Sequence, residues 1–459
     1  MNESEKRSSR GLPCSLGQIA FLVCVLLVAA ILLTYTLTAA SLRRAYTEKL
    51  QQIQQERVEE EASSFSKTAD NLQLLDQVLQ TFSYYADTMD KEAMQAAIFN
   101  AYVQASGDAY ARYYTEAEYE AFRSENNAEM FGVGIGVLSK TFTVQGAERL
   151  GFYIFDIYEG SSAQGTVRIG DWVDAVKVDG VMKTVSELGH SAAAGYIAGA
   201  ENTEVTLRIY RPDDGAFFDA TFVRKKFETK SVYVSQYKDD PSVAVVKITS
   251  FDLKTPIQLK QGMQTFLDAG VTSFVFDVRN NPGGDLQSIR AIASYFLQKG
   301  DVILEQIDRT GKIVKSYHAD PVTMTGEYVH CTVTEDEIGM YAGLKMTVLC
   351  NENTASAAEV FTAVIQDYGL GDVVGMKTYG KGIMQTVRKI TFGDTVGYIK
   401  LTTHAYQTKR GSSYHGVGVL PDHIVDLSEA AKGESLLILA QDQDEQLKTA
   451  VQLMRTVNQ

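Results

Sequence analysis

Ser356 and Lys381 are the two residues whose types and spacing best fit nucleophilic catalysis, and they lie 25 positions apart (381 − 356). A serine hydroxyl becomes a nucleophile when a base removes its proton. A lysine amine can be that base if burial lowers its pKa from about 10.4 towards roughly 7–8. Lys381 stands between Gly380 and Gly382, with apolar residues on either side, which favours such burial. The pair could therefore carry out acyl transfer, and Gln385 could orient the lysine by a hydrogen bond without adding a charge.

Ser356 is predicted to stand at a corner between a buried strand and a helix. The apolar run 346–350 predicts the strand, and apolar residues at helical spacing from Val360 to Tyr368 predict the helix, with Gly369 at its end. A helix N-terminus offers unpaired N–H groups and the positive end of the helix dipole. The corner therefore suits a nucleophilic oxygen and its oxyanion hole.

Each residue also has a structural interpretation when it is taken alone. An isolated serine at a helix start is usually an N-cap, and an isolated Gly-Lys-Gly is usually a turn. A Ser-His-Asp triad could instead recruit one of three nearby histidines, for which a surface or packing role fits better, given the lysine: His404, His415 and His423. The surrounding motifs must therefore decide between these interpretations.

Two stretches around the pair match a known family. NENTASAAEVFTAVIQDYG at 351–369 and VGMKTYGKGIMQ at 374–385 resemble the carboxyl-terminal processing peptidases (S41 family), which are tail-specific serine proteases with a PDZ domain and a Ser–Lys dyad. The resemblance implies that Ser356 is the nucleophile, that Lys381 is the base and that Gln385 supports it. It further implies a crotonase-like core built from ββα units.

A glycine-rich loop after a buried strand is the second motif of this resemblance. The run 273–279 is too apolar to be half exposed and is followed by the two glycines of DVRNNPGG, Gly283 and Gly284. Because glycine has no side chain, such residues let the backbone approach a neighbour closely. The resemblance implies an oxyanion hole formed by one of them with the N–H of Ala357, and the choice between the glycines stays open.

The segment 131–225 is predicted to be a separate β-rich domain that resembles a PDZ domain. Its opening, FGVGIGV, has GxGxG spacing without a following βαβ unit, so it is not a dinucleotide fingerprint. The resemblance implies that four residues of this loop bind a peptide C-terminus that adds as a strand: Gly132, Val133, Gly134 and Ile135. Arg168 would hold the entering carboxylate or a gate, although a solvated arginine is the simpler interpretation.

The N-terminal region predicts a membrane anchor. Residues 11–42 carry no charge, and 19–40 are almost wholly apolar, long enough to span a bilayer and longer than the apolar core of a signal peptide. We therefore expect an uncleaved anchor rather than a cleaved signal. Basic residues on both sides leave the orientation open, and the short N-terminus favours an N-inside topology. The expected location is the cell membrane, with one span and the bulk of the chain outside the cytoplasm.

Composition excludes other classes. The chain has 43 basic and 57 acidic residues, a formal charge of −14 without a basic stripe, which argues against nucleic-acid binding. The six histidines are scattered, so neither a metal nor another cofactor is expected. Cys331 and Cys350 could form a disulfide, but separate buried thiols fit better without CxxC spacing.

The expected fold is a multidomain α/β protein in which the PDZ-like domain is inserted into the protease. The expected parts are a short cytoplasmic N-terminus (1–17), the transmembrane anchor (18–40), a helical stalk (41–71), an N-terminal helical part of the protease (72–117), the PDZ-like domain (118–225), the protease core (226–427) and a C-terminal helix (428–459).

The resemblance implies an endopeptidase that cuts envelope proteins near apolar C-termini or in regulatory segments, which would place it in signal transduction. It also implies dimers or larger rings, and it leaves an activating partner protein open.

Two other classes of protein function have weaker support in the sequence. Gly375 to Lys381 matches G-x-x-x-x-G-K of a P-loop, but Gly382 stands where Ser or Thr would bind magnesium, and a strand is predicted to follow. The second alternative is a scaffold that binds protein tails without catalysis. This alternative rests only on the general rule that a fold does not determine a function.

Overall fold

The computed structural model describes residues 49, 67–126, 129–325, 330–392, 395–411 and 413–456. The predicted N-terminus (1–17), the predicted anchor (18–40) and most of the predicted stalk lie outside these residues. Within the described ranges, no helix has the length and apolar character needed to cross a membrane. The chain divides into two units, residues 1–93 and 94–459, and α2 (Lys91–Gln104) begins in the first and continues in the second.

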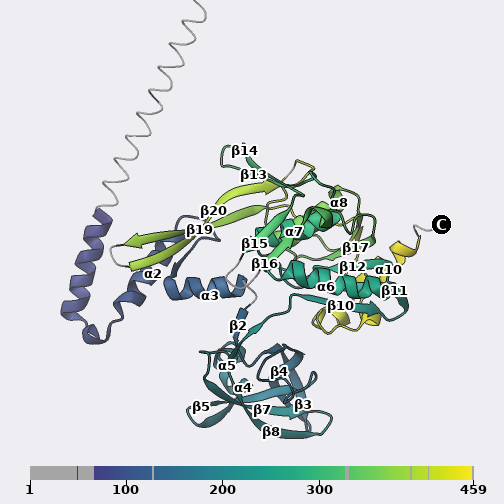
Figure 1. Ribbon diagram of the computed structural model, residues 1–459. Coiled ribbons are helices and arrows are strands. Elements are labelled where there is room, and N and C mark those ends of the chain that lie inside the picture. The colour runs from purple at the N-terminus through teal and green to yellow at the C-terminus, as the bar shows by residue number, and fades with distance from the viewer. Residues whose placement is uncertain are drawn as a thin grey trace, which may run out of the picture. The chain divides into compact units, whose positions relative to one another are not determined.

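The central element is a sheet whose described strands run in the order β10-β11-β12-β17-β18-β21 (Figure 1). β10 pairs antiparallel with β11, and the remaining pairs are parallel. The strands are β10 (Val232–Tyr237), β11 (Asp240–Ile248), β12 (Ser273–Asp277), β17 (Lys345–Cys350), β18 (Gly371–Gly375) and β21 (His423–Ile424). The α/β class expected from the sequence is confirmed.

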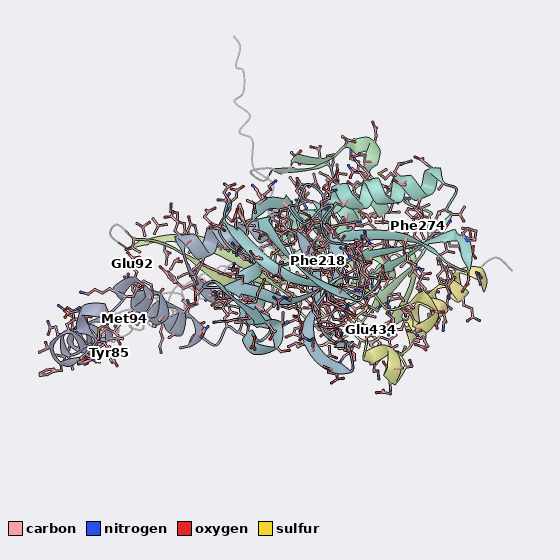
Figure 2. All side chains as sticks on the ribbon, turned by 90° about the horizontal axis from the view of Figure 1, so that it is seen from below. Tyr85, Glu92, Met94, Phe218, Phe274 and Glu434 are labelled. Carbon is pink, nitrogen blue, oxygen red and sulfur yellow. The ribbon has the colours of Figure 1, made fainter. Side chains whose placement is uncertain are left out.

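Alternate residues of these strands face two different layers. On β12, Phe274 (labelled in Figure 2) and Phe276 belong to the larger core, to which α6 (Thr255–Asp268), α7 (Leu286–Phe296) and α8 (Ala357–Asp367) contribute. Val275 belongs to a second core with the apolar face of α10 (Glu445–Thr456). The strand is therefore buried on both faces, which explains its unbroken apolar sequence.

The C-terminal region differs from the single helix expected over 428–459. The structure has a short α9 (Glu429–Lys432), then a 3-10 turn, η3 (Gln441–Gln443), before α10 begins. Gly433 ends α9, and the Asp444 carboxylate accepts a hydrogen bond from Leu447 N at 3.0 Å at the start of α10. The expectation of one continuous helix is wrong because these residues stop and restart the helix.

A second sheet carries a long hairpin beside the central layer. Its described order is β1-β20-β13-β14, and β19 pairs with β20 (Figure 1). Its strands are β1 (Arg112–Thr115), β13 (Val302–Ile307), β14 (Ile313–His318), β19 (Ile383–Phe392) and β20 (Thr395–Gln407). This sheet brings residues near 110 and 400 towards the loop that precedes β19.

A β-rich part with its own hydrophobic core occupies the middle of the chain. Its described strands run β3-β4-β5-β7-β8, with β6 on β5, and a two-stranded β2–β9 ladder joins it to the rest. The elements are β2 (Glu129–Gly132), β3 (Ile135–Val144), β4 (Ala147–Ile157), β5 (Trp172–Val178), β6 (Val181–Thr184), α4 (Val185–Leu188), α5 (His190–Ile197), β7 (Glu204–Arg211), β8 (Ala216–Val223) and β9 (Lys225–Glu228).

Smaller elements complete the second unit. They are α3 (Glu116–Asn126), β15 (Val322–Thr325), β16 (His330–Val333) and η2 (Glu335–Glu337). Cys350, at the end of β17, is a buried free thiol.

Candidate active site

Ser356 occupies the predicted corner between β17 and α8, as the N-cap residue of α8. Its backbone has φ 55° and ψ −118°. A positive φ is uncommon for a residue with a side chain, and such strain clusters at functional sites. The corner therefore has the strained backbone that a strand-to-helix nucleophile position commonly shows.

A buried carboxylate, Glu359, joins the serine to the lysine loop. Its Oε2 accepts hydrogen bonds from Ser356 N at 2.9 Å and Lys381 N at 2.8 Å, and its Oε1 accepts from Gly380 N at 2.7 Å and Thr378 Oγ1 at 2.6 Å. The residue is fully buried. Glu359 was not among the predicted site residues, although its Ser-x-x-Glu spacing is the signal of a capping box.

These bonds also exclude the P-loop alternative. The amides of Gly380 and Lys381 both donate to Glu359, so they are committed to an internal carboxylate instead of facing a phosphate. A strand, β19, follows the loop where a P-loop requires a helix.

The Lys381 amine is partly buried and has an altered pKa. Burial lowers that pKa, the positive charge of Lys400 lowers it further, and the charge of Glu359 opposes both effects. The ammonium lies over the ring of Tyr110, with Nζ 4.6 Å from the ring centroid. In the described part of the chain, no hydrogen bond joins Lys381 Nζ to the Ser356 hydroxyl, although the backbone amides of both residues donate to Glu359.

Tyr406, on β20, lies between the serine and the lysine. Its buried hydroxyl donates to the Lys381 carbonyl at 2.7 Å. Burial raises the pKa of Tyr406, and the neighbouring Tyr414 and Ser356 side chains oppose the rise. No local sequence pattern pointed to Tyr406, because its partners come from other segments of the chain.

Of the two candidate oxyanion glycines, Gly283 is the one beside the serine. A Cβ added to Gly283, whose φ is +98°, would lie 2.7 Å from Ser356 Cβ and 2.8 Å from Ala357 N. A Cβ on Gly284 would instead lie 2.2 Å from the Phe251 carbonyl oxygen. The Gly283 N–H donates to Asn281 Oδ1 at 2.9 Å, so an oxyanion at this amide would have to replace that bond.

Three asparagines tie the glycine loop to the loop before Ser356. Asn280 N donates to Asn351 Oδ1 at 2.9 Å, and Asn351 Nδ2 donates back to Asn280 Oδ1 at 2.7 Å. Asn353 Nδ2 also reaches Asn280 Oδ1, at 3.0 Å. The two loops therefore form one hydrogen-bonded unit, which fixes the glycines against the serine corner.

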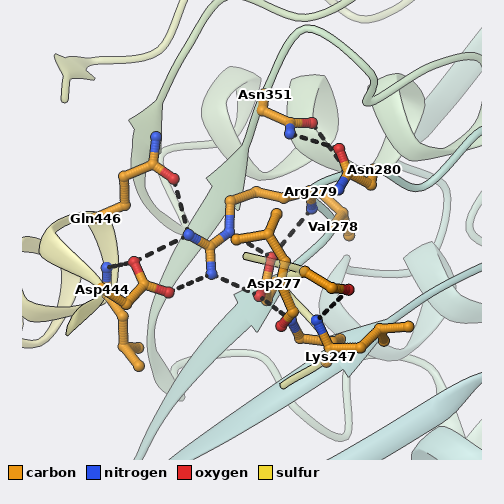
Figure 3. Close-up of polar contacts among 12 residues, drawn as sticks. Lys247, Asp277, Val278, Arg279, Asn280, Asn351, Asp444 and Gln446 are labelled. Carbon is orange, nitrogen blue, oxygen red and sulfur yellow. Dashed lines mark hydrogen bonds and ion pairs between the residues drawn. The ribbon is translucent and has the colours of Figure 1, made fainter. Parts of the chain in front are cut away.

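A buried ionic network around Arg279, the residue before Asn280, supports this unit (Figure 3). The Arg279 guanidinium donates to Asp277 Oδ2 at 2.8 Å, to Asp444 Oδ2 at 2.6 Å and to Gln446 Oε1 at 2.8 Å. Lys247 also pairs with Asp277, at 3.0 Å. Burial acts to raise the pKa of Asp277, but the charges of Arg279 and Lys247 outweigh it and hold that pKa well below its usual range.

Gln385 does not contact the lysine amine as expected. Its Nε2 donates to Thr402 Oγ1 at 3.3 Å, and Thr402 Oγ1 donates to Asp108 Oδ1 at 2.9 Å. The glutamine lies on β19 directly opposite Thr402 on β20, next to an irregularity in the pairing. The strand register therefore directs its amide to the neighbouring strand.

The four predicted peptide-binding residues lie where β2 ends and β3 begins. Val133 is buried, and its carbonyl accepts from Ala163 N at 3.1 Å. Gly134 has φ +77°, and a Cβ there would meet Ser161 Cβ at 2.1 Å, so this position requires glycine. The Arg168 amide donates to Asp171 Oδ2 at 2.9 Å, while its side chain is exposed.

Comparison with known proteins gives consistent matches. Residues 242–425 match the family Peptidase_S41, described as peptidase family S41. A "Probable CtpA-like serine protease" of Staphylococcus saprophyticus is 28% identical over 363 residues, covering 79% of this chain and 67% of that protein. Its counterpart in Staphylococcus aureus is 27% identical over 402 residues, covering 85% of this chain and 73% of that protein.

Solved structures are also similar. The photosystem II D1 C-terminal processing protease has 21% identity and a TM-score of 0.42, covering 76% of this chain and 89% of that chain. Mature CPAF complexed with lactacystin has 14% identity and a TM-score of 0.38, covering 84% of this chain and 98% of that chain.

Proposed function

Because the chain belongs to peptidase family S41 and is a serine-type, carboxyl-terminal processing peptidase, we propose that it cleaves extracytoplasmic proteins with a Ser356–Lys381 dyad. The matched segment contains the serine corner, the lysine loop and the glycine loop. The observation that carries the proposal is the buried Glu359 carboxylate, which accepts from both Ser356 N and Lys381 N and so holds the two residues in one site.

In the proposed mechanism, neutral Lys381 removes the proton from the Ser356 hydroxyl as the serine oxygen attacks the peptide carbonyl carbon. Burial and the charge of Lys400 support the neutral amine by lowering its pKa. The developing oxyanion would be stabilised by the N–H groups of Ala357 and Gly283.

The protonated lysine then gives its proton to the leaving amine, and an acyl-enzyme ester remains on Ser356. A water molecule, deprotonated by the same lysine, hydrolyses this ester and regenerates the serine.

The β-rich part is proposed to act as a PDZ domain that receives apolar C-terminal tails. The geometry at Val133 and Gly134 supports this, because a tight glycine turn leads directly into β3. A tail could add to such a loop as a strand, with its carboxylate at backbone N–H groups. The exposed side chain of Arg168 is free to meet that carboxylate or to contact the protease part.

The proposed location is the cell membrane, with the chain held by residues 18–40 and its bulk outside the cytoplasm. The length and apolar character of that segment support the proposal. Its substrates there would be envelope proteins cut near their C-termini or in regulatory segments, and its assembly would be a homo-oligomer or a complex with an activating protein.

Cleavage of an unfolded protein with an apolar C-terminus tests this function. The full-length chain in detergent should produce fragments, while Ser356→Ala and Lys381→Ala should reduce the rate by at least about a thousandfold. Equal cleavage by all three proteins would refute the dyad. Specific binding of the tail without cleavage by any of them would favour the scaffold.

A further inference from the structure

The ring of Tyr110 lies directly against the amine of the candidate base. Lys381 Nζ is 4.6 Å from the centre of this ring, within the distance at which a cation is attracted by an aromatic face. Burial and the neighbouring Tyr379 side chain raise the pKa of Tyr110. The contact joins the loop that carries Lys381 to the segment just before β1.

Asp108 fixes this segment in place. Its Oδ1 accepts from Tyr110 N at 3.0 Å and from Thr402 Oγ1 at 2.9 Å, and its Oδ2 accepts from Thr402 N at 2.7 Å. Thr402 Oγ1 also accepts from Gln385 Nε2. Residues 108–110 therefore reach both Lys381, through the ring, and Gln385, through Thr402.

Several titratable or charged groups surround the Lys381 amine or the ring that it contacts. They are Glu359 on α8, Lys400 and Tyr406 on β20, Asp108 and Tyr110 before β1, and Tyr379 in the lysine loop. Glu359 favours the ammonium, whereas Lys400 disfavours it. The Tyr110 ring adds a second attraction, and it acts only on the charged form, because a neutral amine has no cation for the ring quadrupole to attract.

We propose that Tyr110 is a positioning residue whose ring holds the Lys381 ammonium away from Ser356, so that the dyad forms only when the amine leaves the ring. The proposal rests on the proposed roles of Ser356 and Lys381. It explains why the serine and lysine share Glu359 while no hydrogen bond joins their side chains in the described part of the chain. It makes the segment 108–110 the element that opposes activity in the resting enzyme.

Two substitutions separate the ring from the hydroxyl. Tyr110→Phe keeps the ring face and removes only the hydroxyl, so it is the matched control. Tyr110→Leu removes the ring but keeps apolar bulk, and Tyr110→Met is a second variant of this kind if the leucine chain fails to fold. The measurements are the pH profile of kcat/KM for the full-length chain in detergent and the titration of the Lys381 13Cε NMR signal, which Lys381→Ala assigns.

The proposal predicts that Tyr110→Leu lowers the pKa of Lys381 by about one unit and raises kcat/KM at pH 7 by up to about tenfold, while Tyr110→Phe resembles the wild type. An unchanged pKa in Tyr110→Leu would overturn it. A raised pKa would also overturn it, because the ring would then serve only to exclude water from the amine. If the wild type cleaves nothing, the proposed function fails, and the NMR titration still decides the role of Tyr110.

Discussion

At the scale of single residues, the site depends on groups that commit their polar atoms to one another. Glu359 uses both carboxylate oxygens for the serine and lysine loops, and the Gly283 amide is bonded to Asn281. Sequence reasoning found Ser356 and Lys381 because their spacing and neighbours are local patterns. It missed Tyr110 and Tyr406 because their contacts with the lysine loop arise only when β20 pairs with β1 and with β19.

The first prediction concerns the two glycines. In Gly283→Ala the new Cβ would lie 2.7 Å from Ser356 Cβ, so the serine corner must shift and cleavage should fall by at least about a hundredfold. In Gly284→Ala the Cβ would meet the Phe251 carbonyl, so the folded state should lose stability. Cleavage rates and urea unfolding of both variants would check this. A Gly283→Ala enzyme with wild-type activity would remove Gly283 from the oxyanion hole.

The second prediction concerns pH. Lys381 must be neutral to act as a base, so kcat/KM should rise with pH through the pKa of Lys381, with a midpoint below the ordinary lysine value of about 10.4. Because the charge of Lys400 lowers this pKa, Lys400→Gln should move the midpoint upward. Lys389→Gln, at an exposed position on β19, is the control and should leave the profile unchanged. A downward shift in Lys400→Gln would contradict this electrostatic role.

At the scale of elements, periodicity predicted the central strands and α8 well, since strands buried on both faces have continuous apolar runs. The C-terminal region was harder, because it is polar and its helices stop and restart at Gly433 and Asp444. The pairing of Arg279 with Asp444 joins residues 165 positions apart, and no local pattern encodes such a contact. The sequence therefore predicted these elements, but not the contacts that support them.

The third prediction tests that support. Asp444→Ala removes an acceptor from the buried Arg279 guanidinium and the cap of α10, so it should lower the free energy of unfolding by about 2–4 kcal/mol. Asp442→Ala is the control, because its ion pair with Lys238 is exposed and should contribute little to stability. Urea denaturation followed by circular dichroism measures both. Equal effects would mean that the network does not stabilise the fold.

At the scale of the whole molecule, one chain would combine the proposed membrane anchor, the proposed tail-binding domain and the peptidase. The link between the β-rich part and the C-terminal region includes an ion pair of Lys140 with Glu434, at 2.8 Å (Glu434 is labelled in Figure 2). Substrates delivered by the β-rich part would reach a site whose lysine is held by Tyr110.

The fourth prediction concerns location. A chain that lacks residues 18–40 should leave the membrane fraction and appear in the soluble fraction, because no other segment with comparable apolar length occurs in the sequence. Carbonate extraction of membranes from cells that express each form provides the measurement. A full-length chain that carbonate releases would contradict the anchor.

The most direct test of the central claim is mass spectrometry of the chain after reaction with a fluorophosphonate, which modifies activated serines. The account predicts one adduct, on Ser356, with no adduct in Ser356→Ala and a rate reduced by at least about a hundredfold in Lys381→Ala. An adduct on another residue, or an equal rate in Lys381→Ala, would show that a different nucleophile or base carries out the chemistry.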